Sequence, residues 1–65
     1  MDDDAPVSLE DQARCVEREI KQREYVYPRR VAAGTMTQAF ATLQIAHMRA
    51  VLKTVAAERD KGRLI

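Results

Sequence analysis

The sequence predicts an all-α protein, an antiparallel helical hairpin of two long helices joined by one short helix. Apolar residues recur at helical spacing over residues 9–26 and again over residues 38–60. Between these runs, Pro28 and Gly34 mark helix boundaries. A chain of 65 residues forms one domain at most and buries a modest core. We therefore expect a flexible acidic tail at residues 1–7 and a single helical domain at residues 8–65.

The first long helix is expected to begin after Ser8, whose hydroxyl can cap the first turn. Acidic residues in that turn interact favourably with the helix dipole. One face of this helix carries Leu9, Ala13, Val16, Ile20 and Tyr27, with a gap at Arg23 or Glu24. Acid-first pairs four residues apart should add ~0.2 to 0.5 kcal/mol each, and they are Glu10 with Arg14, Glu17 with Lys21 and Glu19 with Arg23.

The centre of the chain, residues 27–37, reads as a corner. Proline disfavours the α conformation for the residue before it, so the first helix should end at Val26 and a short helix should follow at residues 28–33. Gly34 can adopt the left-handed conformation that closes a helix. Thr37 can then cap the second long helix through its side-chain oxygen.

The pattern of apolar residues in the second long helix predicts a protein interface. Its seam is formed by Ala41, Ile45, Met48, Leu52 and Val55. Residues 31–48 contain no charged side chain, although charged residues make up 32% of the chain. A membrane span does not explain this stretch, because it contains Gly34, several polar residues and a helix break. We expect a homodimer in a four-helix arrangement, with an interface that includes Phe40, Leu43, His47 and Val51.

The sequence shows no constellation typical of an enzyme. His47 has no carboxylate three or four residues away to orient it, so an interface role is favoured over a catalytic one. Cys15 is expected to be a half-buried packing residue. One Cys and one His cannot build a zinc cluster, and we expect no catalytic residue, metal or cofactor. The acidic start of the chain is unlike a signal peptide, which makes a cytoplasmic protein the default expectation.

A basic segment supports an alternative function, binding of nucleic acid. Residues 1–11 carry five acidic side chains and no basic one, so all eleven basic side chains lie in the remainder. The first helix and the corner combine cations with aromatic rings, a mixture that can contact phosphates and bases. The candidate residues are Arg14, Arg18, Lys21, Tyr25, Arg29 and Arg30. Against this reading, Glu17, Glu19 and Glu24 dilute the patch, and the second long helix begins without Arg, Lys or Asn to read bases.

Two resemblances bear on the setting of the protein. The segment YVYPRRVAAGTMTQAFATLQIAHMRAV resembles small uncharacterised α-helical proteins of bacterial phages and prophages, which share a YP, V-A-x-G, M-T and I-A-x-M pattern. This likeness covers roughly residues 17–52 and implies a phage-related origin and an α-helical fold. Gly34, Met36 and Thr37 also match the outline of short oligomerisation modules, which implies self-association.

The expected function is therefore that of a non-enzymatic, self-associating helical interaction protein. The alternative is a small nucleic-acid-binding accessory protein that uses the basic first helix with Arg29 and Arg30. Salt separates the two functions, because phosphate contacts weaken steeply as salt rises.

Overall fold

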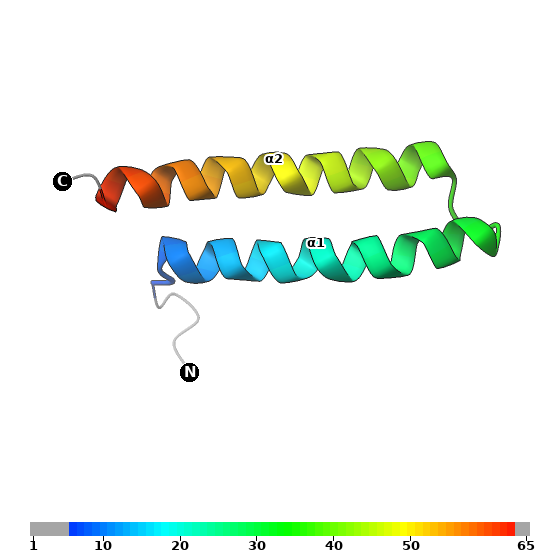
Figure 1. Ribbon diagram of the computed structural model, residues 1–65, viewed down its shortest axis with the longest axis horizontal. Helices are drawn as coiled ribbons and strands as arrows, with labels where there is room; N and C mark the ends of the chain where they lie inside the picture. The colour runs from blue at the N-terminus through cyan, green and yellow to red at the C-terminus, as the bar shows by residue number, and fades with distance from the viewer. Residues whose placement is uncertain (1–5, 64–65) are drawn as a thin grey trace.

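The computed structural model describes residues 6–63, apart from the side chain of Arg63, and contains two helices and no strand over that range. Helix α1 (Leu9–Ala32) and helix α2 (Gln38–Arg63) lie side by side and antiparallel, as Figure 1 shows. The prediction of an all-α hairpin is thus confirmed. Most of the predicted tail, residues 1–5, lies outside the described residues, as do Leu64 and Ile65.

Both helix starts use the predicted caps. The Ser8 hydroxyl accepts a hydrogen bond from the Asp11 amide at 3.0 Å, and Ser8 itself is extended at φ −63° and ψ 152°. At the start of α2, the Thr37 hydroxyl accepts a hydrogen bond from the Phe40 amide at 3.1 Å. Each hydroxyl satisfies one of the amides that have no partner within the helix. Local side-chain chemistry therefore fixes where both helices begin.

The connection between the helices spans residues 33–37 and closes α1 with a Schellman motif. The Gly34 amide donates to the Val31 carbonyl at 3.1 Å, and the Thr35 amide donates to the Arg30 carbonyl at 3.0 Å. Gly34 adopts φ 78°, the left-handed conformation predicted for it. The turn reverses the chain within five residues, which brings α2 back along α1 (Figure 1).

The predicted break at Pro28 is wrong, because α1 continues through this residue to Ala32. No separate short helix exists at residues 28–33, and the first helix does not end at Val26. A proline inside a helix costs the one hydrogen bond that its missing N–H would donate, together with a steric clash. A full stop would instead leave up to four carbonyls and four amides without helical partners. Continuation also keeps Tyr27 and Val31 beside α2, where they line a groove with Ala41 and Ile45.

The two helices meet along the predicted seam. On α1, Ala13 is fully buried and Ile20 is nearly so, while on α2 the same holds for Ala41. The other apolar seam positions of α2 are half-buried, namely Ile45, Met48, Leu52 and Val55. Small alanines at buried positions allow the helix axes to approach closely, and larger side chains fill the space on either side.

An arginine interrupts the apolar seam on α1, and another ends the seam on α2. Arg23 occupies the gap noted between Ile20 and Tyr27, and Arg59 follows Val55 at the same spacing on α2. Both side chains are about one-quarter exposed, at 28% and 25%. Their aliphatic stems cover apolar surface while the guanidinium groups reach carboxylates on their own helices. The apolar core is consequently short as well as narrow.

The left-handed conformation of Gly34 predicts a loss of stability when a side chain is added there. Gly34→Ala should destabilise the fold by about 1 kcal/mol, and a β-branched residue by more, because L-residues pay a steric cost at positive φ. Gly62→Ala is the matched control, since a Cβ at either glycine meets nothing within 4 Å and Gly62 lies inside α2. In urea unfolding followed by circular dichroism, the free energy of unfolding of Gly62→Ala should be equal to or higher than that of wild type. Equal stabilities of Gly34→Val and wild type would contradict the assigned role of Gly34.

The position of Pro28 inside α1 predicts that its removal stabilises the protein. Pro28→Ala should raise the free energy of unfolding by about 1 to 3 kcal/mol, because the amide of residue 28 could then donate to the Glu24 carbonyl. Pro6→Ala, ahead of the helix, should change this value by less than about 1 kcal/mol. Thermal unfolding at one fixed protein concentration measures both. A Pro28→Ala variant less stable than wild type would favour the interrupted helix that the sequence suggests.

Candidate functional site

The first candidate site is an exposed apolar stripe on α2, formed by Phe40, Leu43, His47 and Val51. The spacing of three, four and four residues places these side chains along one side of the helix. Phe40 and Leu43 are each 50% exposed, and Val51 is 46% exposed. His47 is exposed between them. The structure thus brings together all four residues of the predicted interface on one continuous surface, which we call the α2 stripe.

The side chains of the described residues that could ligate a metal do not gather into one site. Among residues 6–63, no three His, Cys, Asp or Glu side chains lie close enough together to hold a metal ion. His47 forms no hydrogen bond or ion pair with any described side chain. Cys15 is exposed, which corrects the expectation of a half-buried packing residue. It follows Ala13 by two residues, so the helical repeat turns it away from α2.

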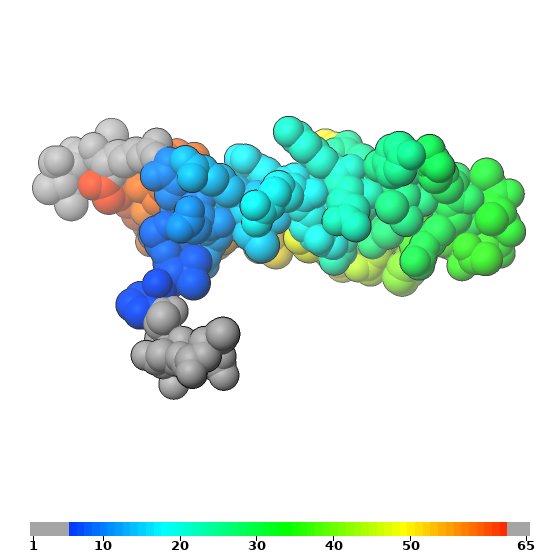
Figure 2. Space-filling view, turned by 90° about the horizontal axis from the view of Figure 1, so that it is seen from below, coloured from blue at the N-terminus to red at the C-terminus, as the bar shows by residue number. Residues whose placement is uncertain are grey.

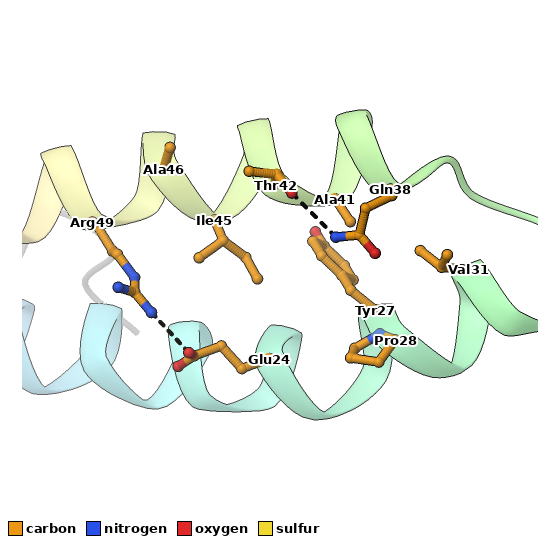
Figure 3. A pocket seen from close by; sticks show the side chains of 10 residues that line it. All are labelled: Glu24, Tyr27, Pro28, Val31, Gln38, Ala41, Thr42, Ile45, Ala46 and Arg49. Carbon is orange, nitrogen blue, oxygen red and sulfur yellow. Dashed lines mark hydrogen bonds and ion pairs between the residues drawn. The ribbon is translucent and has the colours of Figure 1, made fainter.

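A groove of about 450 Å³ lies between the helices near the turn, and sequence reasoning did not anticipate it. Figure 3 shows Tyr27 and Ile45 pointing into the space between α1 and α2. Pro28 and Val31 continue the apolar wall toward the turn. The polar rim consists of Glu24, Gln38, Thr42 and Arg49. On α2 the helical repeat puts this groove and the α2 stripe on opposite sides of the seam.

An ion pair crosses the groove and ties the two helices together. The Arg49 guanidinium donates to the Glu24 carboxylate at 2.8 Å, from Nη2 to Oε2 (Figure 3). The partners are 25 residues apart, so their meeting depends on the register of α1 against α2. No spacing rule within one helix could predict it. The side chains remain 61% and 44% exposed, which limits the stabilisation they provide.

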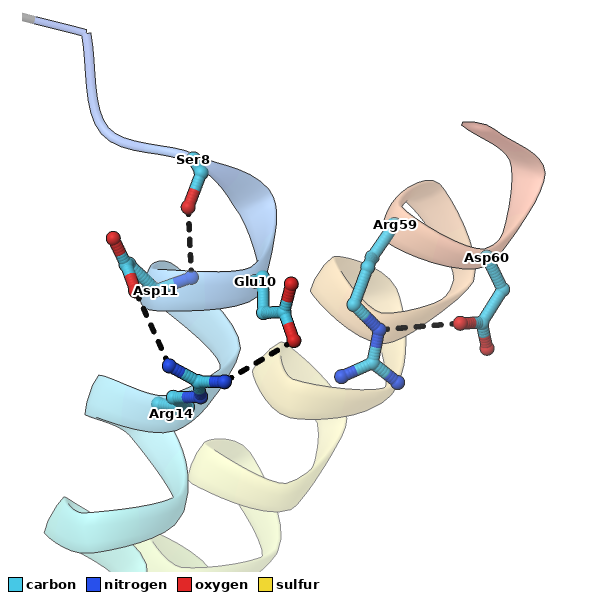
Figure 4. Close-up of polar contacts among 6 residues, drawn as sticks. All are labelled: Ser8, Glu10, Asp11, Arg14, Arg59 and Asp60. Atoms are coloured by element: carbon cyan, nitrogen blue, oxygen red, sulfur yellow. Dashed lines mark hydrogen bonds and ion pairs between the residues drawn. The ribbon is translucent and has the colours of Figure 1, made fainter. Parts of the chain in front are cut away.

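The predicted basic residues divide into three groups according to their surroundings. Arg14 is neutralised at the open end of the hairpin, where Glu10 lies 3.2 Å away and Asp11 lies 3.8 Å away (Figure 4). Arg30 lines a second, smaller hollow with Arg23 and Val26. The remaining four residues follow one another along a single side of α1 that faces away from α2, and they are Arg18, Lys21, Tyr25 and Arg29. In Figure 2, α1 lies in front of α2, so the view shows the side of α1 that faces away from α2.

Two of the three predicted pairs within α1 form. Besides Glu10 with Arg14, the Arg23 guanidinium donates to Glu19 at 2.8 Å. This hydrogen bond raises the pKa of Arg23 above its ordinary value, although burial acts in the opposite direction. Arg23 therefore stays charged at every physiological pH. Glu17 and Lys21 do not form the third pair.

Comparison with known proteins provides no relative: no family model, no curated protein and no solved structure matches the chain. Neither helix, over the residues described, combines the length and the apolar character that crossing a membrane requires.

The ion pair across the groove predicts a small, salt-sensitive coupling. A double-mutant cycle of Glu24→Gln and Arg49→Gln should give about 0.2 to 1 kcal/mol, because both groups are largely solvated. The same cycle on Glu10 and Arg14 provides a within-helix comparison. Unfolding in 50 mM and 500 mM salt should show the coupling shrink as the charges are screened. A coupling above about 2 kcal/mol would mean that the pair is far less solvated than its exposure indicates.

Proposed function

We propose that this chain is a non-enzymatic helical interaction protein that associates with a second copy through the α2 stripe. The observation that carries the proposal is the scarcity of buried apolar residues. Among the described residues, only Ala13, Ile20 and Ala41 are buried, and no large side chain is fully buried. A hairpin with so little core is marginal alone. A second copy would supply the missing cover.

Burial of the α2 stripe would contribute enough free energy to stabilise a dimer. Full exposure of a Leu, Phe or Val side chain forfeits ~1.5 to 3 kcal/mol of burial. Phe40, Leu43 and Val51 are each about half exposed, so covering all three would recover roughly 2 to 4 kcal/mol per copy. This gain is comparable with a large fraction of the stability of a small domain.

The composition of the stripe suits contact with protein. No Asp, Glu, Lys or Arg occurs in residues 31–48, and interface cores are likewise depleted of charge. The exposed imidazole of His47 is the stripe's one polar side chain, and two such groups can share a hydrogen bond across an interface or meet water.

The stripe is self-complementary in an antiparallel pairing of two α2 helices. Such a pairing sets Phe40 of one copy against Val51 of the other, and Leu43 against His47, about a two-fold axis. An isologous contact of this kind closes after two copies and produces a four-helix arrangement. The resemblance of residues 17–52 to phage and prophage proteins supports a phage-related setting for this assembly.

Sedimentation equilibrium between nanomolar and high micromolar concentration tests the proposal. Wild type should be dimeric at micromolar concentration, and its melting temperature should rise with protein concentration. Phe40→Glu and Val51→Glu should each weaken association at least 10-fold, since a carboxylate would be buried without a partner. Tyr25→Glu is the control: it places the same charge at an exposed aromatic position on α1, and association should persist.

Two outcomes would contradict self-association through the stripe. One is a 7.4 kDa species that remains folded and monomeric across the whole concentration range. The other is a dimer that withstands both Phe40→Glu and Val51→Glu. In the second case the contact must lie elsewhere, with the groove between the helices as the next surface to mutate.

A further inference from the structure

We propose that α1 binds single-stranded nucleic acid through the outward surface formed by Arg18, Lys21, Tyr25 and Arg29, which we call the α1 basic face. Cations on this surface would contact phosphates, and the Tyr25 ring would stack against a base. The proposal does not depend on self-association, because α1 turns this face away from α2.

The four residues form a continuous track along the helix. Their spacing of three, four and four residues keeps them on one side of α1. Eleven residues separate Arg18 from Arg29, so the track is about 16 Å long at 1.5 Å per residue. Arg14 adds little positive charge to this track, because its guanidinium is paired with the carboxylates of Glu10 and Asp11. Arg30 lies on another side of the helix, beside Arg23.

Of the three acidic residues that dilute the basic segment in the sequence, two are held by arginines outside the face, and the third, Glu17, is exposed and forms no ion pair with Lys21. Glu19 accepts a hydrogen bond from Arg23 at 2.8 Å, and Glu24 accepts one from Arg49 at the same distance. Arg18 and Lys21 form no ion pair with the described residues. The charge of the track is therefore available to an anionic partner, which argues from charge complementarity for a polyanion.

Tyr25 adds a feature that a purely electrostatic surface lacks. Its ring is part of a side chain that is 63% exposed, the most exposed large apolar residue described. The guanidinium carbon of Arg29 lies 4.1 Å from the ring centroid, and the same group donates a hydrogen bond to the Tyr25 hydroxyl. These two contacts fix the Tyr25 ring beside a cation. Stacking of bases on such a platform is how proteins bind single strands without reading their sequence.

The composition of the face favours a nucleic-acid strand over a membrane. Helices that lie on membranes bury a broad apolar side in the lipid, usually rich in Leu, Phe or Trp. The Tyr25 ring is the only large apolar group on the α1 basic face, which is too little for insertion into lipid. A duplex is also disfavoured, because the first turn of α2 contains no Arg, Lys or Asn to pair with base edges in a major groove, and its one candidate, Gln38, already donates to the Thr42 hydroxyl at 3.1 Å.

Fluorescence anisotropy with a labelled single-stranded oligonucleotide of mixed sequence tests the proposal. Three phosphate contacts predict that log affinity falls with log salt at a slope near −2, so affinity should drop about 20-fold between 50 mM and 200 mM salt. Lys21→Gln should reduce this drop to about 7-fold by removing one contact. Lys53→Gln, the same substitution at an exposed position of α2, should leave the slope unchanged. Tyr25→Ala should weaken binding about 5- to 100-fold at fixed salt with little change in slope.

Several results would overturn the proposal, and circular dichroism of each variant establishes that it remains folded. These results are the absence of binding at 50 mM salt, an equal change of slope in Lys21→Gln and Lys53→Gln, and full affinity in Tyr25→Ala. Binding to phosphatidylserine vesicles without binding to the oligonucleotide would assign the face to a membrane instead. Inorganic polyphosphate competing as well as the oligonucleotide would reduce the face to a general anion site.

Discussion

The packing of α1 against α2 along a single seam is the constraint on which the rest of the structure depends. Each helix can bury only the side that faces its one neighbour, and the most buried residues are Ala13, Ile20 and Ala41. All other surface is left to solvent or to another molecule. The hairpin therefore holds two unlike surfaces in fixed relation, an apolar one along α2 and a basic one along the back of α1. In a larger domain, further elements would cover these sides of the helices. Here both surfaces stay exposed because the hairpin, over residues 6–63, has no third element to pack on them.

The sequence predicted those features of the fold that depend on a few neighbouring residues. Ser8 and Thr37 cap their helices through hydroxyl groups, and Gly34 reverses the chain at positive φ, because each effect arises within one turn. The prediction at Pro28 is wrong for the opposite reason. Proline disfavours the α conformation for the residue before it, which favours a helix end at this point. An unbroken helix, however, keeps Tyr27 beside α2 and avoids an extra pair of helix ends with unpaired backbone groups. These two gains outweigh the local preference.

The candidate surfaces were predictable to unequal degrees. The α2 stripe follows from the helical repeat of α2, with three of its four residues in the charge-free segment 31–48, so the sequence alone predicts its members. The basic residues could be recognised from composition but not assigned to surfaces. Arg29 falls on the same side as Lys21 and Tyr25 only because the helix runs unbroken through Pro28. The bridge from Glu24 to Arg49 and the groove beneath it depend on the register between helices, which no pattern within either helix encodes.

The position of the turn near the middle of the chain has a consequence for the order of folding. Facing residues lie about ten apart next to Gly34, as Val31 and Ala41 do, and already 25 apart at the Glu24–Arg49 bridge. Closing the short loop therefore costs little entropy, and each later contact joins helices that are already docked. Assembly should advance like a zipper from the turn toward the end where Leu9 and Arg63 lie (Figure 1). Opening should run in reverse, with the paired ends of α1 and α2 separating first and the Schellman turn persisting longest.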